Sequence, residues 1–209
     1  MDSLDEYGNV LWHSAQGSYT EQYESIQQEA IKVKYALSRA KQDTCNEILR
    51  VLAGNGNAAR SILCHGVRRG EELRYFSHEK VQEIVWTDLY VPPDAYCRIV
   101  KWDMNKSHSA FDLRFDVIYS NSIDHARNPI EALLVWANQL NSKPSSRIVL
   151  ELDSGHGAIG SSDLDVVGFH LRNFPFYLSI EAGDTLYCDR IVPSKMVPTR
   201  YFYFISRRR

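Results

Sequence analysis

The chain has 209 residues, of which 44% are hydrophobic and 24% are charged, and its formal net charge is −2 with neutral histidines. This composition is that of an ordinary globular protein and excludes a mainly disordered, collagen-like or coiled-coil chain. A net charge so close to zero also gives no strong electrostatic attraction to nucleic acid or to an anionic membrane.

We expect neither an export signal nor a membrane span. Residues 1–9 carry acidic side chains in place of a basic, then apolar, leader, and no apolar run approaches the ~20 residues of a membrane span. The four cysteines form no C-x-x-C pair, which favours reduced thiols; they are Cys45, Cys64, Cys97 and Cys188. We therefore expect a cytoplasmic protein without membrane attachment.

Two helices are predicted in the first quarter of the chain. Residues 19–40 contain no Pro or Gly, and their apolar side chains recur at steps of three and four. Residues 44–52 have the same spacing and end in the turn-forming run 54–57. That run superficially matches a dinucleotide-binding pattern, but too little chain follows it for a helix, so we interpret it as a connecting loop.

Short apolar runs follow, of the kind that suits strands buried on both faces of a parallel sheet. They are residues 61–64, 84–86, 98–101, 115–119 and 147–152. Residues 128–140 have helical spacing with Pro129 in the first turn, which completes a βαβ unit. Near the end, residues 176–180 and 201–205 are rich in aromatic and branched side chains, and they predict an antiparallel strand pair at one edge.

Three of the predicted strands end in glycine or an acid. The first runs into a loop with Gly66 and Gly70, Asp88 follows the second, and Asp103 follows the third. Because the carboxyl ends of parallel strands meet at one edge of a sheet, we expect these residues to converge. An acid about 20 residues after a glycine turn is placed to accept hydrogen bonds from ribose hydroxyls. The pattern predicts a nucleotide-like cofactor.

The succession of these pieces resembles a class I, Rossmann-like S-adenosylmethionine-dependent methyltransferase over about residues 62–152. Residues 62–70 resemble the family's first motif, Asp88 its ribose-binding acid, and Asp103 with Met104 its adenine-contacting pair. Residues 115–121, with Asp124 and His125 after them, resemble the fourth-strand motif, whose end lies between cofactor and acceptor.

The resemblance implies a three-layer sandwich with a mostly parallel seven-stranded sheet, an antiparallel C-terminal strand pair, and N-terminal helices packed over the sheet. We expect one domain over residues 1–209, with a helical cap at 1–57 and a Rossmann-like core at 58–209. The implied cofactor is S-adenosylmethionine, whose methyl group passes to an O, N or C nucleophile. The acceptor is unidentified, and a small molecule or glycan is favoured over nucleic acid.

The resemblance also implies site residues. Those expected at the cofactor are His65, Gly66, Gly70, Asp88, Leu89, Asp103, Met104 and Ser120. His125 and Asp124 are the candidates for taking a proton from the acceptor. No metal is implied, since Asp153, His156 and His170 match no strong zinc spacing. Aromatic residues Trp86 and Tyr119 are assigned to the core.

Two residues depart from the family's first motif. Cys64 stands where Asp or Glu is usual, and Arg68 stands where a middle glycine is common. These departures leave open a non-catalytic binding or scaffolding protein with the same fold. An NAD-dependent oxidoreductase is a further alternative, which the lack of a full G-x-G-x-x-G motif weakens. A nucleic-acid methyltransferase would differ only in its acceptor. Three glycines within residues 154–175 predict a mobile cover over the acceptor; they are Gly155, Gly157 and Gly160.

Overall fold

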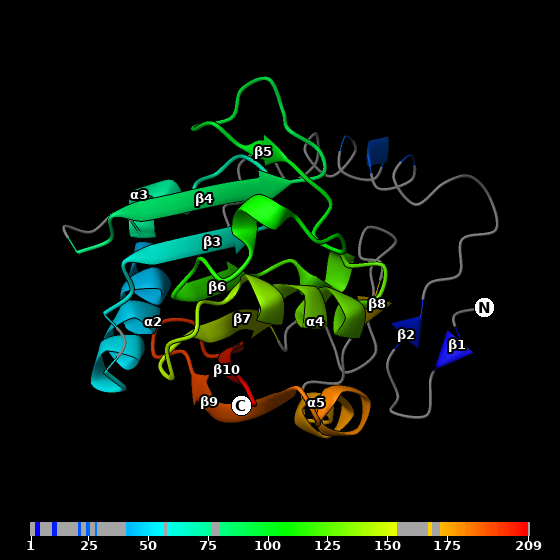
Figure 1. Cartoon of the computed structure of the whole chain (residues 1–209). Coiled ribbons are helices and arrows are strands. Elements are labelled where there is room, and N and C mark those ends of the chain that lie inside the picture. Colours follow the sequence, from blue (N-terminus) through cyan, green and yellow to red (C-terminus); the bar gives the residue numbers. More distant parts are fainter. Residues whose placement is uncertain are drawn as a thin grey trace.

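A computed structural model describes residues 3–4, 10–11, 21, 24–25, 28, 41–56, 58–76, 80–153, 167–168 and 172–208. Its centre is a seven-stranded sheet with the strand order β5-β4-β3-β6-β7-β10-β9 (Figure 1). The strands are β3 (Ser61–His65), β4 (Glu83–Asp88), β5 (Val100–Lys101), β6 (Val117–Ser120), β7 (Arg147–Asp153), β9 (Leu186–Pro193) and β10 (Arg200–Arg207).

Strands β3 to β7 pair with one another in parallel, as the apolar runs predict. Strand β10 is antiparallel to both β7 and β9. From β3 the chain goes to β4 and β5 on one side, and then crosses to β6 and β7 on the other. The strand order therefore reverses between β3 and β6, and ligands of open α/β sheets bind outside the carboxyl ends of the strands at such a switch point.

Helices cover both faces of the sheet, because alternate residues of each strand point to opposite faces. Ile62 and Cys64 belong to a core cluster that includes side chains of α2 (Gln42–Gly54) and α3 (Leu73–Phe76). Leu63 belongs to a second cluster, shared with α4 (Pro129–Gln139) and α5 (Phe174–Ala182). The fold is thus the expected three-layer sandwich.

Two predicted helices are confirmed with slightly different bounds. Helix α2 contains the predicted residues 44–52, and Gly56 in the following turn has a φ of +76°. Helix α4 begins at Pro129, and the Asn128 side chain caps it by accepting hydrogen bonds from the main-chain N–H groups of Ile130 (3.2 Å) and Glu131 (3.3 Å).

The prediction of a strand at residues 176–180 is wrong, because these residues lie in α5. Phe174 and Leu178 are buried at helical spacing, whereas Phe176 and Ile180 are 71% and 64% exposed. The true partner of β10 is β9, an edge strand with several exposed residues. The antiparallel pair exists as expected, but the sequence pattern placed its first member one element too early.

Part of the N-terminal region also lies near the sheet. A small antiparallel sheet, which was not predicted, joins β1 (Ser3–Leu4), β2 (Val10–Leu11) and β8 (Val167–Gly168). Within the predicted helix 19–40, residues 21, 24, 25 and 28 are helical and the others lie outside the described residues. Glu24 forms an ion pair with Lys101 of β5 (2.7 Å), which ties this helix to the sheet edge. In the described part of the chain, no helix is long and apolar enough to cross a membrane.

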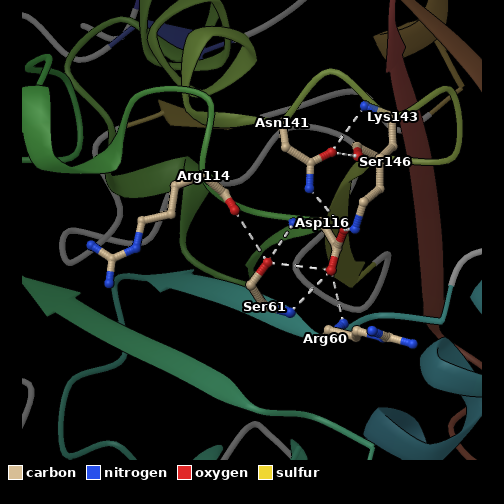
Figure 2. A network of polar contacts seen from close by, with 7 residues as sticks. All are labelled: Arg60, Ser61, Arg114, Asp116, Asn141, Lys143 and Ser146. Atoms are coloured by element: carbon tan, nitrogen blue, oxygen red, sulfur yellow. Dashed lines mark hydrogen bonds and ion pairs between the residues drawn. The ribbon is translucent and has the colours of Figure 1, made fainter.

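At the edge where the parallel strands begin, Asp116 holds several segments together (Figure 2). Its carboxylate is 2% exposed and accepts hydrogen bonds from the main-chain N–H groups of Arg60 (2.9 Å) and Ser61 (3.1 Å). It also accepts from Asn141 Nδ2 (2.7 Å) and Lys143 Nζ (2.6 Å). Burial alone would raise the pKa of Asp116, but these donors together lower it. The network fixes the starts of β3 and β6 against the turn before β7.

We expect Asp116→Asn to lower the free energy of unfolding by about 2–3 kcal/mol at pH 7, because one carboxylate satisfies several donors. The pKa is lowered in the folded state, so this stabilisation is present above the unfolded-state value of about 3.9 and is lost as the pH falls through the folded-state pKa. Urea unfolding at pH 7 and about pH 3 measures both effects. The exposed Asp112→Asn is the control; equal losses in the two variants would contradict the assignment.

Candidate functional site

The loop after β3 has the backbone shape of a glycine-rich turn. Gly66, Arg68 and Gly70 have φ angles of +71°, +52° and +77°. The main-chain N–H groups of Gly66 and Val67 donate to the carbonyl of Thr87 on β4 (2.9 and 3.3 Å). Arg68 holds a left-handed conformation that costs an L-residue about 1–2 kcal/mol. The loop therefore keeps the conformation that a middle glycine would adopt without cost.

Gly66 is required by a close approach to the loop after β6. A Cβ at this position would lie 2.6 Å from the Cβ of Ser122. The hydroxyl of Ser122 donates to the Gly66 carbonyl (2.9 Å), and the N–H of Ser122 donates to the hydroxyl of Ser120 (3.0 Å). Ser120 in turn donates to the His65 carbonyl (3.0 Å). These bonds tie the ends of β3 and β6 together across the switch point.

The structure gives the side chains of His65 and Ser120 a supporting position, not one open to a ligand. His65 is 1% exposed, and its ring nitrogens lie 2.6 Å from Thr87 Oγ1 and 3.0 Å from Gln139 Oε1. The ring stacks on Trp136 with centroids 4.7 Å apart. Burial lowers the pKa of His65 to about 4, so the ring is neutral near pH 7. The family resemblance places both residues at the cofactor, but the sequence could not show that their side chains are buried.

Asp88 joins the end of β4 to the glycine loop. Its buried carboxylate accepts hydrogen bonds from the N–H groups of Arg68 (2.7 Å) and Tyr90 (2.9 Å), and its carbonyl accepts from the N–H of Trp102 (2.9 Å). Burial raises the pKa of Asp88, against the effect of these N–H groups and of the nearby charges of His125 and Arg68. Leu89 follows and is half-buried.

Asp103 lies at the end of β5, next to β4. One carboxylate oxygen accepts from the N–H (2.9 Å) and the side-chain amide (2.7 Å) of Asn105, and the other is 3.7 Å from Lys106 Nζ. Met104 is buried, and its methyl group lies 3.6 Å from where a Cβ on Gly66 would be. Asp88, Asp103 and the loop therefore gather at the same edge of the sheet, as the sequence predicts.

Asp124 and His125 lie in the single turn η2 (Ile123–His125), directly after the loop that contacts Gly66. His125 is buried and Asp124 is half-buried. The charge of His125 lowers the pKa of Asp88, so the two side chains lie within electrostatic range. Strand β8 packs against η2, which brings the chain after β7 back to this edge. Of the predicted cover and metal residues, positions 154–166 and 169–171 lie outside the described part.

On the face covered by α2 and α3, Tyr119 and Trp86 are core residues, as expected. The Tyr119 hydroxyl donates to Glu151 (2.7 Å), whose other oxygen accepts from Arg200. Sequence reasoning missed two residues near the loop, Ser122 and the buried Glu72. A serine three positions past a predicted strand end was the available signal for the first, whereas the burial of one acid in a Glu-Glu pair leaves no pattern in the sequence.

Two hollows lie at the opposite edge of the sheet. One of about 260 Å³ lies between α2 and the starts of β3 and β4, beside Arg50 and Lys80. The other, of about 600 Å³, lies between the end of α5 and Arg208. Neither touches the glycine loop, Asp88 or Asp103, so these hollows do not bear on the site at the switch point.

Comparisons with known proteins show the fold. No protein-family profile matches the sequence, and no curated protein matches it. Among solved structures, the 1,6-didemethyltoxoflavin-N1-methyltransferase of Burkholderia thailandensis, with 1,6-didemethyltoxoflavin and S-adenosylhomocysteine bound, is 16% identical with a TM-score of 0.61, over 99% of this chain and 97% of that one. The plantazolicin methyltransferase BpumL, with a triazolic desmethylPZN analog and S-adenosylhomocysteine, is 14% identical with a TM-score of 0.59, over 91% and 97%.

A SAM-dependent methyltransferase of Leishmania major gives a TM-score of 0.65 at 10% identity, over 90% of this chain and 81% of that one. At such low identities the likeness concerns the backbone. It shows that the chain has the class I, Rossmann-like methyltransferase fold that the sequence motifs predict.

We expect Gly66→Ala to lower the free energy of unfolding by about 1–3 kcal/mol, because an alanine there meets both an unfavourable φ and the Ser122 side chain. Gly54→Ala is the matched control, since nothing lies within 4 Å of its added Cβ at the end of α2. The control variant should be as stable as the parent or slightly more stable. Denaturant titration of the three proteins measures this; a fully stable Gly66→Ala would contradict the described loop.

Proposed function

We propose that this protein is a methyltransferase that uses S-adenosylmethionine and transfers its methyl group to an O, N or C nucleophile of a small acceptor. The observation that carries the proposal is the position of Asp88. Its carboxylate ends β4 beside the switch point and holds the N–H of Arg68 in the glycine loop. Two enzymes with the same fold were solved with S-adenosylhomocysteine, the product that this cofactor leaves.

We assign the residues at this edge to the nucleoside part of the cofactor. An ionised carboxylate has about four acceptor sites, so Asp88 is able to serve the loop and two ribose hydroxyls at once. Asp103, held by Asn105, and the neighbouring Met104 would contact the adenine, with Leu89 against its face. The main chain of residues 66–70 would lie along the methionine part of the cofactor, since this loop follows β3 at the switch point.

The bound cofactor would supply the reactive methyl group on its sulfonium, and the protein would bind and orient the two reactants. No protein nucleophile is needed, because the acceptor attacks the methyl carbon directly. The site must hold the two reacting atoms about 3–3.5 Å apart and in line with the sulfur. When the acceptor is a hydroxyl or an ammonium, His125 or Asp124 would take its proton. The burial of His125 beside Asp88 supports a position at this edge.

A small acceptor is favoured by two facts. The net charge of −2 gives no attraction for a polyanion. The similar Burkholderia enzyme was solved with 1,6-didemethyltoxoflavin, and BpumL was solved with a desmethylPZN analog. We therefore favour a small molecule or a glycan over nucleic acid.

Ligand-induced stabilisation tests the cofactor class. A ligand present at 100 times its dissociation constant adds about 2.7 kcal/mol to the free energy of unfolding, which raises the melting temperature by several degrees. We expect S-adenosylmethionine and S-adenosylhomocysteine to stabilise the protein and NAD to have no effect. Stabilisation by NAD alone would favour an oxidoreductase. No response to any of the three would favour a non-catalytic protein with this fold.

Asp88→Asn tests the ribose contact. We expect the affinity for S-adenosylhomocysteine to fall by about 1–3 kcal/mol, because the amide loses the charge and turns a donor toward an N–H group of the loop. Isothermal titration calorimetry measures the affinity, and urea unfolding checks that the variant is folded. The exposed Asp184→Asn, in the turn before β9, is the control. Unchanged affinity in the Asp88 variant would remove this residue from the site.

A further inference from the structure

One buried carboxyl group near the glycine loop has an oxygen that no donor reaches. Glu72 and Glu151 are both 5% exposed. Glu151 accepts from Tyr119 on one oxygen and from Arg200 on the other. In contrast, Oε2 of Glu72 is the one buried carboxyl oxygen in the described part of the chain that lacks a hydrogen-bond partner. Burying a carboxylate without a hydrogen-bond partner costs free energy. The group is therefore either protonated or a binding site for a cation.

Glu72 lies where the glycine loop passes into α3, two residues after Gly70. Its charge affects the thiols of Cys64 on β3 and Cys45 on α2, and the hydroxyl of Tyr119 on β6. Glu72 is therefore on the sheet face covered by α2 and α3, near β3 and β6, and its charge also affects the Cys97 thiol between β4 and β5. Asp88 and Asp103 lie on the other side of β3, at the ends of β4 and β5. If those two aspartates hold the nucleoside, the amino-acid end of the same ligand would extend toward Glu72.

Burial raises the pKa of Glu72 to about 8; its own N–H group and the Arg68 charge act in the opposite direction, whereas Glu71 and Glu151 add to the rise. The charged and titratable groups around it are Cys45, Cys64, Arg68, Glu71, Cys97, Tyr119 and Glu151. Burial raises the pKa of all three thiols, so they remain neutral near pH 7. Arg68 is the one cation among these groups, and it forms no ion pair with Glu72.

We propose that Glu72 recognises the ammonium group of the cofactor's methionine part and gives up its proton when that end binds. This assignment rests on the proposed function. In the free protein the carboxyl group is protonated; on binding, its O–H bond breaks, the proton passes to solvent, and the carboxylate accepts a hydrogen bond from the ligand ammonium. Glu72 thus supplies a negative charge near Cys64, the position where the family usually has Asp or Glu.

The test compares S-adenosylhomocysteine with 5′-methylthioadenosine, which has the same nucleoside but no amino-acid part. Calorimetry at about pH 8 measures both ligands on the parent protein, on Glu72→Gln and on the control Glu71→Gln. We expect Glu72→Gln to bind S-adenosylhomocysteine about tenfold or more weakly, the effect of losing one charge-assisted hydrogen bond, and to bind 5′-methylthioadenosine with unchanged affinity. Glu71→Gln should bind both ligands like the parent.

The pH dependence gives a second readout that needs no variant. Because the bound state requires the ionised carboxyl, the affinity of the parent for S-adenosylhomocysteine should rise about tenfold between pH 6.5 and 8.5. The affinity for 5′-methylthioadenosine should stay flat. Titration in two buffers with different heats of ionisation counts the released proton, and we expect a release near pH 7 only for the ligand that carries the ammonium.

The possible results separate the two proposals. If the parent binds neither ligand, the proposed function fails. If both ligands bind and S-adenosylhomocysteine shows neither a loss in Glu72→Gln nor a proton release, the proposed function stands and the role of Glu72 is wrong. Equal weakening of both ligands in Glu72→Gln would assign the residue to folding of the loop and would also overturn its recognition role.

Discussion

The hydrogen bonds that hold the ends of β3 and β6 together determine the position of the glycine loop at the candidate site. Ser120 and Ser122 bridge the two strand ends through the carbonyls of His65 and Gly66. This tie brings the loops so close that Gly66 has no room for a side chain. It also fixes the point where the strand order reverses, so the glycine loop, Asp88 and η2 share one edge.

The buried strands were predictable from the sequence, but the last quarter of the chain was only partly so. Strands covered on both faces read as mainly apolar runs, and residues 62–64 and 148–150 are such runs. At the end of the chain this signal fails, because α5 is apolar on its exposed side as well, with Phe176 and Ile180 facing out. The edge strand β9 is in turn too polar to be recognised. Local composition therefore pointed to a strand where tertiary packing makes a helix.

The candidate site divides in the same way. Glycines in a turn and acids at strand ends leave a pattern in the sequence, so the meeting of the glycine loop and Asp88 at one edge was predictable. Whether a side chain points into the core leaves no such pattern. The sequence therefore could not show that the His65 ring stacks on Trp136. Glu72 is the opposite case, since an acid in a charged helix start gives no sign that it is buried.

The central claim is that one adenosine-containing cofactor spans the switch point, and a crystal structure of the protein grown with S-adenosylhomocysteine tests it most directly. Our account predicts the ribose hydroxyls within hydrogen-bond distance of the Asp88 carboxylate, the adenine beside Asp103, and the ammonium against Glu72. Electron density for the ligand at any other place, or a ribose out of reach of Asp88, would contradict the account.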